Sequence, residues 1–347
     1  MKFYSESVSD WEIVHLYDTQ GGDSIFSKGA KFQATIAGEC HSFSLPESRL
    51  EKAISGLRIL RRLLRTDKSN CVLNQTKDGL AIIKNKKLYF YDLSTKSLSL
   101  TGHLRQSRNV LHQGFCVTDK GIYFGEYGAN KAREPVPIWR SLDGGRSWQI
   151  AHQLSDPAIK HIHGIYKDKY SDSLWITTGD FPGECFLYEA PGEDFSRIER
   201  HGDGSQPWRA VSLIFQRDSI CWAMDSQLQT STLVVFDRVS GDIVQGQAFP
   251  GPVWHCKDLQ GCYLLQSSVE IGPASTSRFA HLYFSEDLRN WTCIAKFKKD
   301  RWPMRFFKFG VLSFADGLQS RDEFYLFGEG LKGLDGKIIK CRLESSA

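Results

Sequence analysis

The sequence predicts an all-β protein, and three observations carry this prediction. Short apolar segments alternate with polar turns along most of the 347 residues, and aromatic residues, which pack well on pleated strands, make up 12% of the chain. Two similar turn sequences begin at Ser141 and Ser285, so they lie 285 − 141 = 144 residues apart, which is three repeats of 48. A period of about 40–50 residues with four short strands is typical of a propeller blade. The sequence therefore predicts a β-propeller of four-stranded antiparallel blades.

The regular blades are expected within residues 68–347, with six blades favoured and seven possible. One complete repeat shows four apolar segments separated by turns, at Gly114–Thr118, Gly121–Glu126, Val136–Ser141 and Trp148–Gln153. Further repeats are expected over 163–200, 210–249 and 253–297, and a last one begins at Phe306. The last repeat reaches the end of the chain before a fourth strand, so it needs a strand from elsewhere.

The N-terminal segment is predicted to supply that strand. Residues 3–11 parallel residues 283–291, each running from an aromatic pair through a polar turn to Trp. We therefore expect residues 1–18 to form an outer hairpin that pairs with the C-terminal blade, which closes the propeller and removes an exposed edge. The whole chain, residues 1–347, is then a single domain.

Residues 19–67 break the repeat and are interpreted as an insertion or a degenerate seventh blade. Two strands are expected, at Lys31–Ile36 and Cys40–Leu45, followed by a helix from Pro46 to Arg65. The helix carries an apolar stripe at helical spacing, formed by Leu50, Ala53, Ile54, Leu57, Leu60 and Leu64. We expect this stripe to face the core and the five arginines of the helix to face solvent.

Composition narrows the classes of partner. The net charge is +4, from 44 basic and 40 acidic residues, which is too balanced for a nucleic-acid or membrane-surface protein. No apolar run reaches the length of a membrane span, and the N-terminus lacks the apolar core of a signal peptide, so a cytoplasmic location is expected. The nine cysteines include no CxxC pair and suit reduced, buried thiols. We expect a monomer without metal or cofactor.

The turn at Ser141–Trp148 reads S-x-D-x-G-x-S-W. Asp and Ser side chains accept hydrogen bonds from backbone N–H groups a few residues on, Gly supplies positive φ, and Trp leads into the next strand. The turn resembles the Asp box, or BNR repeat, of sialidases and related β-propellers. A shorter version without Gly stands at Ser285–Trp291. Since Asp boxes occupy the turn between the third and fourth strands, a ligand is expected at the opposite loops.

The opposite loops contain the polar residues that suit a glycan site. Carboxylates supply acid and base groups, Arg binds anionic groups, and aromatic faces stack on sugar rings. The catalytic candidates are Glu126, Asp180 and Glu270. Acidic groups of a ligand would be held by Arg133, Arg209 and Arg301. The candidates for orienting the sugar are His161, His163, Gln206, Trp208 and Asp225.

Each candidate has a structural alternative. His161 and His163 share one face of a strand and could bind a metal with Asp180, but a hydrogen-bonding role is favoured because no spaced third ligand follows. Glu126 and Asp180 could instead form salt bridges with Arg133 and Arg209. Trp208 is equally suited to a sugar platform and to packing between blades.

The run from Gly125 to Asp180 is also similar to bacterial BNR-repeat, sialidase-like proteins, through Arg140–Gly145, His161–Gly164 and Leu174–Asp180. The resemblance implies a propeller linked to carbohydrate, including anionic glycans or polysaccharide precursors, and a glycoside hydrolase-like activity if the protein is an enzyme. The Arg-Ile-Pro motif of true sialidases is absent, which argues against sialidase activity. The alternative is a non-catalytic propeller that serves as a protein-interaction or assembly platform.

Overall fold

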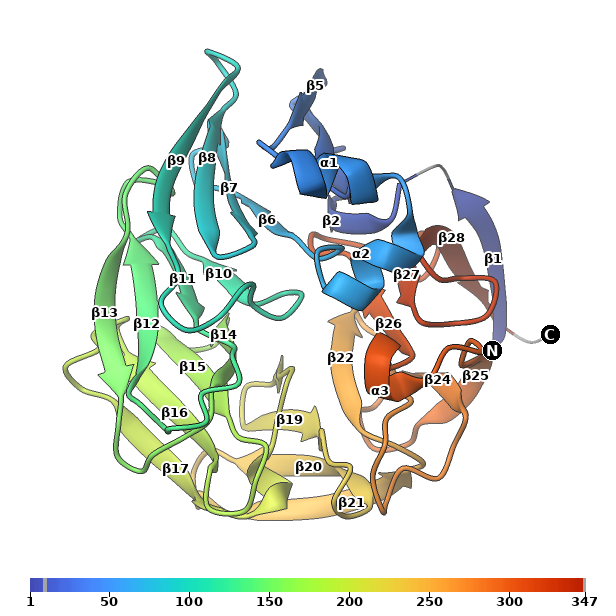
Figure 1. Cartoon of the computed structure of the whole chain (residues 1–347). Coiled ribbons are helices and arrows are strands. Elements are labelled where there is room, and N and C mark those ends of the chain that lie inside the picture. The colour runs from blue at the N-terminus through green and yellow to red at the C-terminus, as the bar shows by residue number, and fades with distance from the viewer. Residues whose placement is uncertain (9–10, 346–347) are drawn as a thin grey trace. The chain divides into compact units, whose positions relative to one another are not determined.

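The computed structural model describes residues 1–8 and 11–345, and their strands form seven sheets of four antiparallel strands (Figure 1). Such sheets are the blades of β-propellers, so the predicted blade architecture is confirmed. The preference for six blades is wrong, because there are seven sheets. The chain divides into two compact units, one of residues 1–69 with the segment from Gln247 onward, and one of residues 70–246.

The first unit holds three sheets and three short helices. One sheet contains β2 (Ile13–Tyr17), β3 (Ser24–Lys28), β4 (Lys31–Ile36) and β5 (Glu39–Ser44). Another contains β22 (Val253–Asp258), β23 (Tyr263–Ser267), β24 (Phe279–Ser285) and β25 (Thr292–Lys298). The third contains β26 (Val311–Phe314), β27 (Phe324–Glu329), β28 (Lys337–Glu344) and β1 (Lys2–Val8). The helices are α1 (Arg49–Ser55), α2 (Arg58–Leu64) and α3 (Met304–Phe307).

The other four sheets belong to the second unit, except for the last three residues of β21, Gln247–Phe249. The first contains β6 (Asn70–Leu73), β7 (Gly79–Lys84), β8 (Lys87–Asp92) and β9 (Ser97–His103), and the second contains β10 (Phe115–Val117), β11 (Ile122–Gly125), β12 (Val136–Ser141) and β13 (Gln149–Leu154). The third contains β14 (Ile162–Lys167), β15 (Ser173–Thr178), β16 (Cys185–Pro191) and β17 (Glu199–Gly204). The fourth contains β18 (Ile214–Phe215), β19 (Ser219–Ala223), β20 (Ser231–Asp237) and β21 (Ile243–Phe249). A 3-10 turn, η1 (Gln206–Trp208), precedes β18. Within the described residues, no helix has the length and apolar character needed to cross a membrane.

The core of the second unit lies between successive sheets. Ile138 of β12 clusters with Ile162 of β14 and Ile176 of β15, all essentially inaccessible to solvent. On the other face of the sheet formed by β14–β17, Trp175 of β15 packs with Trp222 of β19. Apolar side chains on both faces of the inner strands therefore hold the blades together, and the connecting loops carry the polar residues.

The predicted pairing of the N-terminal segment with the C-terminal sheet is confirmed for β1 only. Strand β1 pairs antiparallel with β28, from Lys2 opposite Glu344 to Val8 opposite Ile338. The expectation that residues up to 18 complete this hairpin is wrong, because β2 is the first strand of a different sheet. Val14 is 0% exposed, as expected of an inner strand and not of an outer one. Residues 24–44 complete that sheet, which accounts for the seventh blade.

The predicted single helix is divided at Gly56 into α1 and α2, and several of its residues have the opposite exposure to the one predicted. Leu50 and Leu57 are exposed, whereas Arg61 and Arg62 are buried. Arg61 forms a 2.6 Å ion pair with Glu12. Burial would raise the pKa of Glu12, but the hydrogen bond from Arg61 and the charge of the neighbouring Arg58 hold this pKa below its usual value. The arginines therefore bind α2 to the sheets.

These arginines connect α2 to all three sheets of the first unit. Arg58 pairs with Asp335, which follows β27, at 3.0 Å, and Arg62 pairs with Asp300, which follows β25, at 2.7 Å. Glu12, the partner of Arg61, directly precedes β2. Each cation has a carboxylate partner, which is the condition under which burial of charge is tolerated.

Removal of β1 should lower stability and promote self-association. A chain that lacks residues 1–8 leaves β28 as an open sheet edge and removes Phe3 from its apolar cluster. We expect a lower melting temperature and a larger species in size-exclusion chromatography. A truncated chain that melts and elutes like the full one would contradict this pairing.

Arg61→Met should destabilise the protein by about 3 kcal/mol, because it leaves the buried carboxylate of Glu12 with one cation fewer. Urea denaturation followed by tryptophan fluorescence measures the change in the free energy of unfolding. Arg65→Met is the matched control, because Arg65 is exposed at the end of the same helix. Equal effects of the two substitutions would show that the ion pair contributes nothing specific.

Candidate functional site

The two S-x-D turns connect the third and fourth strands of their sheets, β12 to β13 and β24 to β25. In the first, Asp143 Oδ1 accepts from the Ser147 backbone N–H at 2.8 Å, and Ser141 Oγ accepts from the Gly145 N–H at 2.7 Å. Burial would raise the pKa of Asp143, but hydrogen bonds from Ser147 and Ser141 lower it. Asp143 is therefore fully used in closing the turn.

Asp180 is the centre of the polar cluster in the second unit. It lies in the loop between β15 and β16 and follows Gly179, whose φ is +131°. A Cβ on Gly179 would lie 2.8 Å from the Cys185 sulfur, so this tight departure from β15 requires glycine. The strand end and its glycine thus fix the position of the Asp180 carboxylate.

Four side chains surround that carboxylate. The Nη2 of Arg209 lies 2.8 Å from Oδ1, and the ammonium of Lys160 contacts Oδ2. The Nε2 atoms of His161 and His163 lie 3.5 Å and 3.4 Å from Oδ1. These residues come from the start of β14 and from the segment after η1, so consecutive sheets of one unit build the cluster.

The histidines are positioned by a bulge and by backbone carbonyls. The register of β14 against β15 shifts between Ile162 and Gly164, so His163 is the extra residue of the bulge. Bulges redirect side chains, which here turns His163 toward the same carboxylate as His161. The Nδ1 atoms of His161 and His163 lie 2.8 Å from the carbonyl oxygens of Gly128 and Ala210, respectively. Since a carbonyl can only accept, each Nδ1 carries the proton.

The pKa values in this cluster move in opposite directions. Burial would raise the pKa of Asp180, but the polar and charged neighbours of its carboxylate, including the Arg209 guanidinium, hold it far below its usual value. Burial lowers the pKa of His161 to about 4, although Asp180 works against this shift. At neutral pH the carboxylate is therefore ionised and the His161 imidazole is neutral.

Arg209 is held by more than Asp180. Its Nη2 also pairs with Asp225 at 3.0 Å, and its Nη1 donates to Gln227 Oε1 at 2.8 Å and to the Asp180 backbone carbonyl at 3.0 Å. Gln206 donates to the same carbonyl at 3.3 Å. The structure thus brings together six of the predicted residues, namely Asp180, His161, His163, Gln206, Arg209 and Asp225.

The structure contradicts the catalytic interpretation of Glu126. This residue is buried, and its carboxylate accepts hydrogen bonds from the backbone N–H groups of residues 105–107 and from the indole of Trp139. Every lone pair that would take a proton from a substrate is already engaged within the protein. Glu126 instead fixes the loop that follows β9.

Trp208 is also assigned to packing and not to a sugar platform. Its ring is buried, with its centroid 5.9 Å from those of both Trp222 and Phe236. Because the indole is enclosed in the core, neither of its faces is open for a sugar ring to stack on. Its position in a proline-containing 3-10 turn did not reveal that the ring is buried.

The remaining candidates have separate surroundings. Arg133 pairs with Glu184 at 2.7 Å and lies over the ring of Phe181. In the first unit, Glu270 is buried and accepts from Ser268 Oγ at 2.8 Å, while Arg301 is exposed and stacks on Trp302. Neither Glu270 nor Arg301 is in the unit that contains the Asp180 cluster.

Sequence reasoning missed Lys160 and Phe181. Lys160 directly precedes His161, and Phe181 directly follows Asp180, so neighbourhood in the sequence was the available signal. The Phe181 ring is 44% exposed, with Lys160 Nζ at 5.5 Å and Arg133 Cζ at 5.7 Å from its centroid. A partly exposed aromatic ring with two cations close to it is therefore present next to Asp180 in the sequence.

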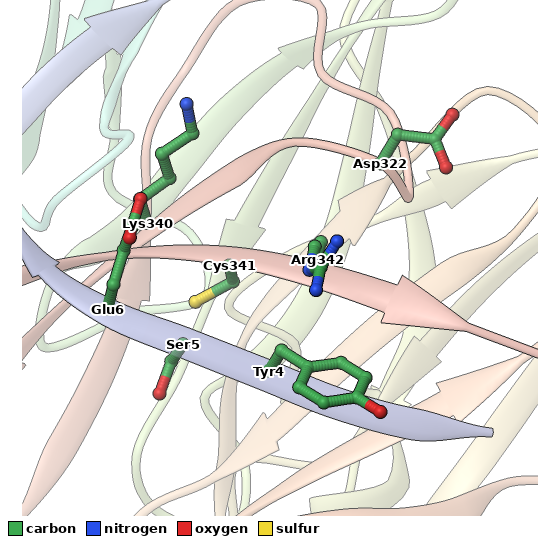
Figure 2. A pocket seen from close by; sticks show the side chains of 7 residues that line it. All are labelled: Tyr4, Ser5, Glu6, Asp322, Lys340, Cys341 and Arg342. Atoms are coloured by element: carbon green, nitrogen blue, oxygen red, sulfur yellow. The ribbon is translucent and has the colours of Figure 1, made fainter.

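A surface pocket of about 440 Å³ lies elsewhere, on the β1–β28 pair of the first unit (Figure 2). It is lined by Tyr4, Ser5, Glu6, Asp322, Lys340, Cys341 and Arg342. Arg342 stacks on Tyr4, and Lys340 pairs with Glu323 at 2.8 Å. None of the predicted site residues lines this pocket, and its cations already have partners.

Solved structures of other proteins share this architecture. The chain matches oligogalacturonate lyase from Vibrio parahaemolyticus with a TM-score of 0.57 and 9% identity, over 99% of this chain and 97% of that one. It matches YCF48 bound to D1 peptide with a TM-score of 0.56 and 12% identity, over 100% and 97% of the two chains. The fold is a β-propeller. It also matches the extracellular domain of BT4673 from B. thetaiotaomicron, with a TM-score of 0.57 and 11% identity, where 99% of this chain spans 40% of that one.

At these identities the β-propeller likeness concerns the fold alone. A further match is an oligogalacturonate lyase in complex with manganese, with a TM-score of 0.54 and 9% identity, over 99% of this chain and 97% of that one. No protein-family model matches the chain, and no curated protein matches it in sequence. Membership of the BNR, sialidase-like group therefore stays a prediction.

Glu126→Gln should lower the free energy of unfolding by about 3 kcal/mol, because an amide nitrogen replaces one of the oxygens that accept backbone N–H groups. Urea denaturation measures this loss. The chemical environment of the Asp180 cluster should not change, as seen in the NMR signals of His161 and His163. An unchanged stability, together with shifted histidine signals, would restore Glu126 to the site.

Proposed function

We propose that the protein binds an anionic carbohydrate at the loops around Phe181 in the second unit. The observation that carries this proposal is the 44% exposed Phe181 ring, which has the cationic groups of Lys160 and Arg133 within 6 Å of its centroid and directly follows Asp180 in the sequence. The C–H face of a sugar ring packs on an aromatic face, and acidic substituents pair with ammonium and guanidinium groups. The combination suits a sugar acid better than a neutral sugar.

The structural neighbours support this chemical class. Two of them are oligogalacturonate lyases, whose named substrate is an acidic oligosaccharide. We also propose a distant relation to the BNR, sialidase-like propellers. Its support is that Asp287 closes its turn as Asp143 does, by accepting from the Asn290 backbone N–H at 2.8 Å.

The proposal is binding, and it does not extend to glycoside hydrolysis. Glycoside hydrolases use a carboxylic acid with a raised pKa together with a second carboxylate. The pKa of Asp180 is lowered, so this residue cannot act as the acid, and the carboxylate of Glu126 is engaged by backbone N–H groups.

A non-catalytic role as a protein-interaction platform is the second candidate. The observation that favours it is that the cations beside Phe181 already have partners, Arg133 with Glu184 and Lys160 with Asp180. One structural neighbour, YCF48, is bound to a peptide. On this alternative, Phe181 contacts an apolar side chain of a partner and the cations stabilise only the loops.

Titration calorimetry with trigalacturonate and with maltotriose separates the two candidates. We expect binding of the acidic trisaccharide only, with an affinity that falls as salt increases. Phe181→Ala should weaken binding about five- to tenfold, in line with about 1 kcal/mol for one aromatic contact.

Tyr170→Ala is the matched control for Phe181→Ala. Tyr170 is also 44% exposed in the same unit, and Lys169 Nζ lies 5.3 Å from its ring centroid. This variant should bind like the unmodified chain. Absence of trigalacturonate binding, or equal losses in both variants, would remove the carbohydrate proposal and leave the platform as the better candidate.

A further inference from the structure

We propose that His161, His163 and Asp180 form a binding site for a divalent transition-metal ion. The ligand atoms, two Nε2 and a carboxylate oxygen, lie within 4.8 Å of one another on buried residues. The Nε2–Oδ1 distances are 3.5 Å and 3.4 Å. Ligands bound at about 2.0–2.2 Å in tetrahedral geometry lie roughly 3.3–3.6 Å apart, so both histidine–carboxylate distances match those of ligands that share one ion.

The protonation of the imidazoles favours this site. Because each Nδ1 donates to a backbone carbonyl, each Nε2 presents its lone pair to Asp180 Oδ1. A second ring nitrogen bound to a carbonyl is the usual arrangement around metal-ligating histidines. His161 is only 2% exposed, and its Nε2 has no hydrogen-bond partner among the described residues. Two lone pairs that face a carboxylate oxygen repel it, and a cation bound among the three atoms would remove this repulsion.

Two cations already contact Asp180, and they differ in how firmly they are held. Arg209 has three further acceptors, Asp225, Gln227 and the Asp180 carbonyl, so it stays in place if Asp180 Oδ1 turns to a metal. The Lys160 side chain is 23% exposed and can swing into solvent. The Lys160 ammonium and the metal ion are therefore alternative partners of one carboxylate.

The donor set selects the class of ion. Two imidazoles with one carboxylate suit ions such as Zn²⁺, whereas Mg²⁺ and Ca²⁺ prefer oxygen ligands. Three protein ligands leave a fourth position for water or a ligand oxygen, as in sites that act on substrates. This inference does not depend on carbohydrate binding, because its ligands are distinct from the Phe181 face.

The test uses the full chain, stripped of metal by a chelator, and Zn²⁺ alone as the probe. Calorimetry should show one ion bound per chain, with no binding of Mg²⁺. His163→Gln and Asp180→Asn should each weaken binding at least tenfold, since each removes a ligand. Lys160→Gln should tighten binding several-fold, because it removes the competing ammonium; a purely structural ion pair gives no such gain.

A second cluster in the same unit provides the matched control. Glu189, Glu199 and His201 also have ligand atoms within 4.8 Å, but they lie nearer the surface. His201→Gln should leave Zn²⁺ binding unchanged. Loss of binding in His201→Gln, retained binding in His163→Gln, or no stoichiometric binding by the unmodified chain would overturn the proposal. Circular dichroism of each variant verifies folding, and visible absorption of the Co²⁺-loaded chain reports whether histidine ligands bind the ion.

Discussion

The buried charge of Asp180 is the constraint on which the arrangement of the polar loops in the second unit depends. An ionised carboxylate out of water costs several kcal/mol unless cations and hydrogen bonds compensate for the lost hydration. Arg209 and Lys160 supply those cations from two different segments, and Asp225 in turn balances Arg209. Loops that belong to neighbouring blades are thereby held together by one carboxylate, and this explains why a single loop residue has contacts with so many others.

Part of this cluster was predictable from the sequence. The position of the S-x-D turn placed the opposite loops on one side of each blade, and those loops contain Asp180, His161 and Arg209. Their mutual contacts were not predictable in detail, because the bulge at His163 and the positive φ of Gly179 depend on packing between strands. Glu126 was misassigned because its partners are backbone N–H groups, which no pattern of side chains reveals.

The fold was predictable at the level of the blade and not at the level of the chain ends. Alternating strands and a 48-residue spacing identified four-stranded blades, whereas residues 13–44 form a blade without an Asp-box turn to mark it. The arginines of α2 reverse the usual rule for an amphipathic helix, because Arg61 finds Glu12 and Arg62 finds Asp300. The periodicity of apolar residues in a helix does not show whether carboxylates from other segments will pair with its arginines.

The direct test of the role of Asp180 is the tautomeric state of its two histidines, measured by ¹⁵N NMR of the metal-free protein at pH 7. If Arg209 and Lys160 neutralise the carboxylate, His161 and His163 are neutral, with the proton on Nδ1 and a lone pair on Nε2. Signals of protonated Nε2 in both rings would show that the histidines themselves provide the compensating charge or hydrogen bonds, and would contradict the arrangement described for this cluster.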